Sequence, residues 1–111
     1  GKVDIAQPDV GRVGGLTEAM KVCDMAAERG RQIIPHCWKT GISISASAHL
    51  AAVTPHCPFF EYLPAELTDS LLRQELVQDD LKLVDGKLAI PQKPGLGIEV
   101  NIDALNRFKQ E

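Results

Sequence analysis

The sequence predicts an α/β fold in which parallel strands alternate with helices. Three short segments have the apolar pattern of strands, at 3–9, 32–36 and 58–63. Two longer segments between them have the pattern of helices, at 16–30 and 42–53. Because the connections are short, right-handed crossovers are expected to join the strands, which then point the same way. Their carboxyl ends would line one edge, where α/β folds build their sites.

The composition is that of one ordinary globular unit. The chain has 111 residues, of which 44% are hydrophobic and 24% charged, so a single core is possible. Its net charge is −3 with acids and bases interspersed, and no basic stripe is available to bind nucleic acid. No apolar run approaches the length of a membrane span, and no signal-like start is present, so no membrane partner is expected.

The cysteines indicate a reducing compartment. Their number is odd and no C-x-x-C occurs, so they do not form a disulfide framework, and the cytoplasm fits best. Cys23 and Cys37 are predicted packing residues. Because the chain begins with Gly1 and strand-like sequence follows within two residues, we expect it to be a piece of a longer chain.

The first strand and helix are predicted in order along the chain. One face of the strand carries Val3, Ile5, Gln7 and Asp9. "GRVGG" follows as a loop. Thr17 is the predicted N-cap of the next helix, and Gly30 its predicted end. The packing stripe of this helix would consist of Ala19, Met20, Cys23 and Ala27.

The second strand, the second helix and the third strand follow. Gln32, Ile34 and His36 share one face of the second strand. "WKTG" is a predicted loop, and the small residues of the helix after it predict deep burial. In the third strand, Phe59, Glu61 and Leu63 share one side.

After Leu63 the pattern changes to short elements. "AELTDSLLRQEL" predicts a helix or helical turn, and alternating residues around Asp85-Gly86 predict a tight hairpin. "PQKPGLG" predicts a rigid loop. The last element is a short helix, "NIDALNRFKQ", which Asn101 is expected to cap.

Asp9, His36 and Glu61 each lie at or near the carboxyl end of a predicted strand, so their side chains are expected to converge. A histidine can take and return a proton near neutral pH. Asp9 would bond to the far ring nitrogen and fix the tautomer, and Glu61 could donate a hydrogen bond to a developing oxyanion. Each also has an ordinary alternative: Asp9 as a turn residue, His36 bonded to a loop carbonyl, and Glu61 solvated.

Other candidate sites have weaker patterns. The pairs His36-Cys37 and His56-Cys57, with His49 between them, lack zinc-finger spacing. "GRVGG" before a helix could hold an anion but matches no phosphate motif, and a tight turn is simpler. Lys39 and Arg12 could meet a carboxylate substrate, and solvated surface charge is again simpler.

Three segments resemble the mandelate racemase group of the enolase superfamily, the mandelate racemase and muconate lactonizing enzyme-like proteins. They are "QPDVGRVGGLTEAMKVCDMAAERG", "IIPHCWKTGISISASAHLAAVTP" and "FFEYL", and the tail "DGKLAIPQKPGLGIEVN" resembles the family's ending. The most specific part is Q-P-D-x-x-x-x-G-G, whose aspartate is followed 27 residues later by the histidine of P-H and 25 residues beyond that by a glutamate. The resemblance runs from Val3 to Phe108.

The resemblance implies a fold. Members of this group have a capping domain over a modified (β/α)8 TIM barrel. Residues 1–63 would supply the C-terminal portion of the barrel, strands six to eight. Residues 64–111 would supply the barrel end and the C-terminal segment, hairpin and short helix, that returns to the capping domain.

The resemblance also implies residue roles and a cofactor. Members abstract the proton α to a carboxylate, and one Mg²⁺ stabilises the enediolate. Asp9 and His36 match the catalytic Asp–His dyad, and Glu61 matches the eighth-strand glutamate that hydrogen-bonds the enediolate. Gln7 falls beside the dyad and Trp38 would line the pocket wall, so both are candidate substrate-binding residues. The acidic metal ligands and the Lys-x-Lys motif are expected upstream of this chain, with no metal ligand in it.

The parent protein is therefore expected to be a Mg²⁺-dependent acid-sugar dehydratase, a lyase, acting on a small carboxylate substrate and assembling as a homo-oligomer. His36 would be either the base or the acid that protonates the leaving hydroxyl. The alternatives are a racemase or epimerase, or a lactone cycloisomerase, of the same superfamily, and a non-catalytic truncated fragment. We expect these 111 residues alone neither to bind Mg²⁺ tightly nor to turn over substrate, and unpaired strand edges to favour aggregation.

Overall fold

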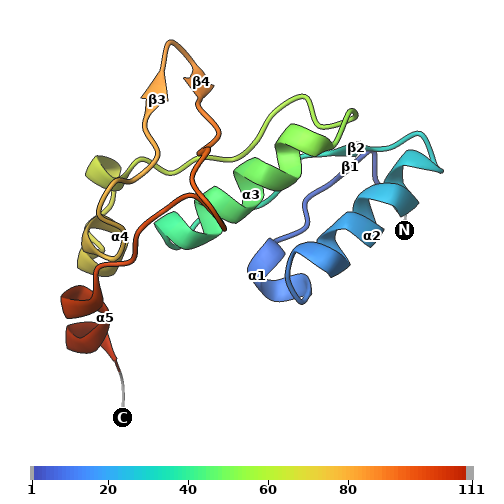
Figure 1. Cartoon of the computed structure of the whole chain (residues 1–111). Coiled ribbons are helices and arrows are strands. Elements are labelled where there is room, and N and C mark those ends of the chain that lie inside the picture. The colour runs from blue at the N-terminus through green and yellow to red at the C-terminus, as the bar shows by residue number, and fades with distance from the viewer. Residues whose placement is uncertain (1, 110–111) are drawn as a thin grey trace.

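Two short parallel strands begin the fold in the computed structural model, which describes residues 2–109. β1 (Ile5–Ala6) pairs with β2 (Gln32–Ile33), with Ile5 opposite Gln32 and Ala6 opposite Ile33. Two helices, α1 (Val10–Val13) and α2 (Leu16–Ala27), connect the strands. The parallel direction of the first two predicted strands is thereby confirmed (Figure 1).

Both strands are shorter than predicted, and at their carboxyl ends each is followed by a proline, Pro8 or Pro35. The backbone bonds continue from Gln32 N to Asp4 O (3.1 Å), from Ile34 N to Ala6 O (3.0 Å) and from His36 N to Pro8 O (3.1 Å). Pro8 has no N–H to return to β2, so the ladder becomes one-sided toward its carboxyl end; Pro35 has the orientation of Ile33, whose N–H faces His56 O on the opposite side. Even so, the two segments stay side by side as far as Pro8 and His36.

The third predicted strand, 58–63, is wrong: no strand is assigned to those positions in the part of the chain that the structure describes. The backbone bond that reaches this part of the chain from β2 runs from Ile33 N to His56 O, at 3.1 Å. Pro58 follows two residues later and cannot donate to a ladder. The segment is instead held by the side-chain bonds described below.

The "GRVGG" segment is a helical turn followed by two glycines, and not wholly a loop. Asp9 caps α1 by accepting from Gly11 N at 2.9 Å and Arg12 N at 3.2 Å. Gly14 and Gly15 then adopt positive φ, 109° and 96°. This reversal lets α2 begin directly, with Gly15 as its N-cap, so the expected cap at Thr17 is wrong.

The packing face of α2 differs by one residue from the prediction. Ala19, Cys23 and Ala26 are buried and Met20 is half-buried, whereas Ala27 is exposed. Positions i, i+4 and i+7 lie on one helical face, and the next residue turns away from it. Gly30 has a φ of 62°, in keeping with its predicted role just beyond the helix.

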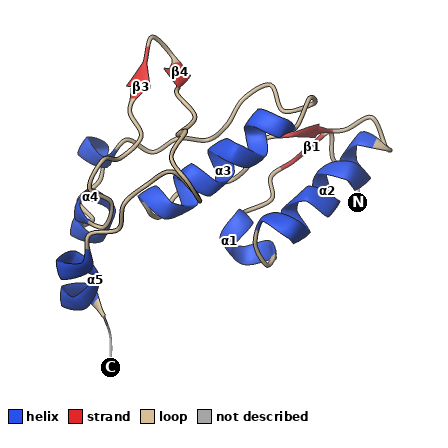
Figure 2. Cartoon of the chain, viewed as in Figure 1, coloured by secondary structure: helices blue, strands red, loops and turns tan. Residues whose placement is uncertain are grey.

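The helix α3 (Gly41–Val53) joins the two parts of the core (Figures 1 and 2). Thr40 caps it by accepting from Ser43 N at 3.4 Å. Ala46 and Leu50 pack in one apolar cluster with residues of α1, α2 and β2, such as Ile33. Ile44 and Ala48 pack in a second cluster that also contains Cys37 and Leu81. The predicted deep burial of this helix is confirmed.

The C-terminal part consists of short elements. They are η1 (Ala65–Leu67), α4 (Leu71–Glu75), the antiparallel strands β3 (Leu83–Val84) and β4 (Lys87–Leu88), and α5 (Ile102–Phe108). Asp85 (φ 49°) and Gly86 (φ 72°) form the predicted hairpin turn. Asn101 caps α5 by accepting from Ala104 N at 3.1 Å, as predicted. Gln110, the end of the predicted helix, lies outside the described residues, and the expected division at residue 63 stays a prediction.

No helix within residues 2–109 combines the length and the apolar character needed to cross a membrane.

Candidate active site

His36 and Glu61 meet at the carboxyl end of β2. His36 follows β2, and Glu61 lies on the extended segment beside it. Glu61 Oε2 is 2.5 Å from His36 Nδ1 and 2.8 Å from the amide nitrogen of Cys37, which donates to it. The two side chains are 34% and 29% exposed, so the pair is partly shielded and still open to a ligand.

This contact sets the tautomer of the imidazole. An ionised carboxylate only accepts hydrogen bonds, so Nδ1 of a neutral His36 carries its proton toward Glu61. Nε2 then keeps a lone pair, which is what a general base needs. The arrangement suits a histidine that takes a proton at Nε2 and is stabilised as an imidazolium by the carboxylate behind it.

Trp38 covers the imidazole on one side. The indole and imidazole rings are stacked, with their centroids 6.4 Å apart and an interplanar angle of 27°. Trp38 is 61% exposed, an unusual position for a large aromatic ring. The structure therefore brings together His36, Glu61 and Trp38, three of the five residues that the sequence singled out.

Asp9 is placed differently from the prediction. Its carboxylate caps α1, and Oδ2 lies 3.3 Å from Arg12 Nε. The hydrogen bond to the ring nitrogen of His36 that was expected from Asp9 is made by Glu61 instead. The physical reason is local: two amide donors and a guanidinium lie within three residues of Asp9. Arg12 is thus an ion-pair partner of Asp9.

Cys37 lies where the charges of the site converge. Burial raises the pKa of its thiol to about 11, against a lowering by the Ser47 side chain; the charges of Asp9 and Glu61 raise the pKa further, and that of Arg73 lowers it. Two carboxylates acting on one thiol lie at the same end of the fold. His36 N donates to Pro8 O at 3.1 Å, so Asp9 directly follows the residue that lies beside His36.

The remaining candidates make no hydrogen bond to His36 or Glu61 within residues 2–109. Gln7 and Lys39 are exposed. The imidazoles of His49 and His56 contact backbone carbonyls, Leu96 O at 3.3 Å and Cys23 O at 3.0 Å. Between Lys2 and Lys109, no three His, Cys, Asp or Glu side chains are grouped so that they could hold a metal ion. The side chains of residues 2–109 thus do not by themselves fit a Mg²⁺ site.

Two contributors to the site have little sequence signal. The Cys37 amide is a backbone donor, which any residue except proline would supply. Arg73 lies in an apolar helical run, Leu71-Leu72-Arg73, and it is buried to 1% exposure. The charge within this apolar run is the one sequence signal that could have pointed to Arg73, because buried arginines are rare unless they are paired.

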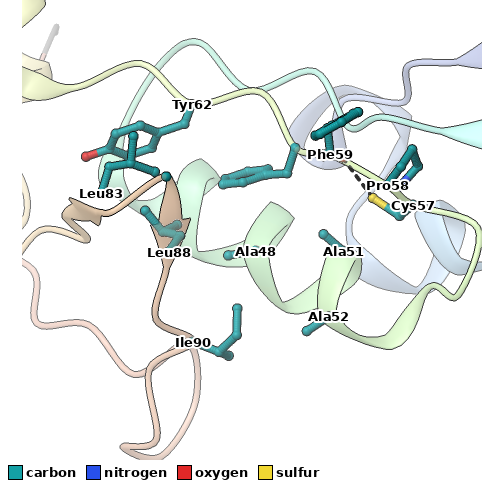
Figure 3. Close-up of a pocket in the computed structure, with 12 residues that line it drawn as sticks. Ala48, Ala51, Ala52, Cys57, Pro58, Phe59, Tyr62, Leu83, Leu88 and Ile90 are labelled. Atoms are coloured by element: carbon teal, nitrogen blue, oxygen red, sulfur yellow. Dashed lines mark hydrogen bonds between the residues drawn. The ribbon is translucent and has the colours of Figure 1, made fainter.

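An apolar cavity of about 280 Å³ lies apart from this pair, between α3, residues 57–62 and the β3–β4 hairpin (Figure 3). Figure 3 shows Tyr62, Leu83 and Leu88 at one end of it and Cys57 and Pro58 at the other. Phe60 and Tyr62, the two neighbours of Glu61, line the cavity, whereas Glu61 does not. The lining lacks histidine and carboxylate groups, so the cavity is not the candidate for chemistry.

The chain resembles several proteins of known sequence along nearly its whole length. It is 40% identical to the D-galactarolactone cycloisomerase of Agrobacterium fabrum, over 98% of this chain and 30% of that protein. It is 36% identical to the D-xylonate dehydratase of Haloferax volcanii, over 98% of this chain and 26% of that protein. The chain thus spans less than a third of the length of these curated relatives.

Solved structures show the same relationship. The crystal structure of the 3,6-anhydro-D-galactonate cycloisomerase from Zobellia galactanivorans matches with a TM-score of 0.85 and 39% identity, over 98% of this chain and 30% of that one. A mandelate racemase/muconate lactonizing enzyme from Jannaschia sp. matches with a TM-score of 0.83 and 29% identity, over 98% of this chain and 27% of that one.

A family description, "Enolase C-terminal domain-like", matches residues 1–104. The resemblance to the mandelate racemase group is thereby confirmed, and so is the fold class, the C-terminal part of a (β/α)8 barrel. The relatives of this chain include sugar-acid dehydratases and cycloisomerases. The chain belongs to the enolase C-terminal domain-like family, in the mandelate racemase group of the enolase superfamily.

Proposed function

We propose that this chain is the C-terminal part of an acid-sugar dehydratase, in which His36 transfers a proton at the carbon next to the substrate carboxylate or at the β-hydroxyl that leaves as water. The observation that carries the proposal is the contact of 2.5 Å between His36 Nδ1 and Glu61 Oε2. It leaves Nε2 as the nitrogen that exchanges the proton. Mg²⁺, the expected cofactor, would be held by residues outside this chain, and the cytoplasm remains the expected compartment.

Each residue of the site has a proposed part. His36 Nε2 takes or returns the proton, and Glu61 accepts from Nδ1 and stabilises the imidazolium. Trp38 forms a wall of the substrate site and stacks against the imidazole. Asp9 keeps α1 and Arg12 in place and adds negative charge close by, and Gln7 contacts the substrate at the rim.

A lactone cycloisomerase is the second candidate. Identities of 40% and 39% to two cycloisomerases favour it. The first step, proton transfer next to the carboxylate, is the same for both reactions. They differ in the group that departs or adds at the β carbon: water in the dehydratase, an internal oxygen in the cycloisomerase.

The test uses the full-length protein that carries this chain, with galactonate, xylonate and arabinonate as acid substrates and galactarolactone as the lactone. Trapping with semicarbazide measures the keto acid that dehydration yields, and solvent deuterium incorporation without elimination would indicate a racemase. His36→Asn is expected to lower kcat by about 10² to 10⁴, the usual loss for a general acid or base. Glu28→Gln, at an exposed surface glutamate, is the control. Normal turnover by His36→Asn would overturn the proposal.

A further inference from the structure

The backbone just beyond Glu61 is held by the C-terminal segment. The Tyr62 hydroxyl donates to Leu81 O at 2.6 Å, and Arg73 Nη2 donates to Leu63 O at 2.9 Å. No strand is assigned at 58–63 in the described chain, so these bonds replace the ladder that would ordinarily fix a strand. The position of Glu61 therefore depends on residues 73–81, which follow it in the sequence.

Arg73 is the centre of this arrangement. It lies in α4, is 1% exposed, and forms an ion pair with Asp80 through Nη1. One guanidinium thus reaches two places at once, the Leu63 carbonyl and the Asp80 carboxylate. The planar fork of arginine makes this possible, since its nitrogens point in fixed directions.

Asp80 links the Arg73–Asp80 ion pair to the start of α3, which follows Cys37 in the chain. A Cβ added to Gly41 would lie 2.8 Å from Asp80 Oδ1 and 2.7 Å from Val77 Cγ2, closer than real Cβ contacts. Gly41 is the first residue of α3, four residues after Cys37, whose amide binds Glu61. The Arg73–Asp80 pair therefore packs against the start of α3 while it holds the end of the Glu61 segment.

Stability alone is a poor explanation for this ion pair. Arg73 Nε and Asp80 Oδ1 are buried with no hydrogen-bond partner among residues 2–109. Burying two charges with polar atoms left over costs free energy, and apolar residues of similar size are often as stable. The positive charge of Arg73 also acts on the Cys37 thiol, whose pKa it lowers against the dominant effect of burial, so it lies within electrostatic reach of the site.

We propose that Arg73 is a positioning residue for the His36–Glu61 pair: it fixes the Leu63 carbonyl and, through Asp80, the start of α3, and so holds the Glu61 carboxylate against the imidazole. The proposal rests on the function proposed above, and it adds a residue far from the predicted strand ends. Arg73 acts through Glu61 and does not touch the substrate.

The test compares matched pairs of substitutions in the full-length protein. Arg73→Met with Asp80→Leu removes both buried charges and the bond to Leu63 O while it keeps apolar packing. The expected result is a Tm within a few degrees of the unmodified protein and a kcat at least tenfold lower, with KM changed less than threefold. The control is Arg107→Met with Glu75→Leu, which removes a more exposed ion pair between α4 and α5 and is expected to leave kcat unchanged.

Two further variants separate positioning from general loosening. Arg73→Lys keeps a charge for Asp80 but has no fork, so it is expected to restore part of the lost kcat. In a Glu61→Gln background, Arg73→Met with Asp80→Leu is expected to cause no further loss, because its effect passes through Glu61.

The outcomes distinguish this proposal from the one it rests on. If Glu61→Gln leaves kcat unchanged, the proposed function of the pair fails. If Glu61→Gln lowers kcat whereas the Arg73 and Asp80 double variant does not, only the positioning role fails. Additive losses in the Glu61→Gln background also overturn it. Should the double variant not fold, Arg73→Lys decides: an unchanged kcat overturns the proposal and a reduced one supports it.

Discussion

Glu61 Oε2 lies 2.5 Å from His36 Nδ1, although 25 positions separate the two residues along the chain. The same oxygen accepts from the Cys37 amide at 2.8 Å. Because one carboxylate oxygen joins a ring nitrogen and a backbone amide, the imidazole orientation is tied to the backbone that carries it. A histidine held in this way needs little rearrangement before it exchanges a proton.

Shortening the Glu61 side chain is expected to be nearly as damaging as neutralising it. Glu61→Asp withdraws the carboxylate from both Nδ1 and the Cys37 amide, since one methylene is lost from a side chain that spans the gap between two segments. We expect kcat to fall by at least tenfold in Glu61→Asp. Steady-state kinetics on the full-length protein measure this, with Glu28→Asp as the surface control, and full activity in Glu61→Asp would contradict the geometry.

Substitutions of Asp9 are expected to distinguish its structural role as a helix cap from its proposed role in catalysis. Asparagine caps helices as well as aspartate does, whereas alanine loses the cap at a cost of about 1 kcal/mol. Asp9→Asn should therefore keep the bonds to Gly11 N and Arg12 N and the stability, while it removes the charge near Cys37. Denaturant unfolding and kcat are measured on both variants.

If Asp9→Asn retains full activity and Asp9→Ala loses only stability, the role of Asp9 is that of a cap alone. A loss of kcat in Asp9→Asn at unchanged stability would instead support the catalytic role predicted from the sequence.

The Cys37 thiol is expected to be unreactive in the folded protein. It is 1% exposed, and burial raises its pKa to about 11 from an ordinary value of 9.0. The thiolate, which is the reactive form, is therefore scarce at pH 8. Iodoacetamide labelling with peptide mapping should find Cys37 unmodified until denaturant is added, and rapid labelling of the native protein would contradict its burial.

The same shift predicts how stability depends on pH. Above pH 9.0 the unfolded chain releases the thiol proton, whereas the folded chain keeps it until about pH 11. The unfolded state then binds fewer protons, so this group's contribution to stability is complete below pH 9.0 and is lost as pH rises toward 11. Urea unfolding between pH 8 and pH 11 should show a smaller decline for Cys37→Ala than for the unmodified protein.

Gly41→Ala is expected to destabilise the protein by about 1–3 kcal/mol, the usual cost of overpacking a filled core. Its Cβ would meet Val77 Cγ2 and Asp80 Oδ1, at 2.7 and 2.8 Å. Gly11→Ala is the matched control, because its Cβ would make only an ordinary contact of 3.4 Å with Asp9 Oδ1. The difference between the two midpoints of urea unfolding measures the effect, and equal midpoints would show that α3 can move away from residues 77–80.

Local patterns predicted most of the elements and the neighbourhood of the site. The hairpin at Asp85-Gly86 and the cap at Asn101 depend on residues next to them in the chain, so their signals are strong. His36 and Glu61 meet because both lie near the ends of neighbouring extended segments, which the order of elements implies.

Contacts between distant residues could not be predicted in the same way. Two carboxylates compete for the hydrogen bond from His36 Nδ1. The amides of α1 and the Arg12 guanidinium bind Asp9, so Glu61 accepts from the imidazole. The third predicted strand ends its pairing with β2 before Pro58, and the segment is held instead by the bonds of Arg73 and Tyr62 to Leu63 O and Leu81 O. No periodicity in the sequence reports such long-range bonds.

The stacking of Trp38 on His36 also gives the site a built-in optical signal. Trp38 is the only tryptophan among the 111 residues, and its ring lies 6.4 Å from the imidazole. A positive charge next to an indole ring acts on its π system, so the emission of this one side chain is expected to respond to the charge of His36. A spectroscopic label for the pair is thus already present in the natural sequence, next to the imidazole itself.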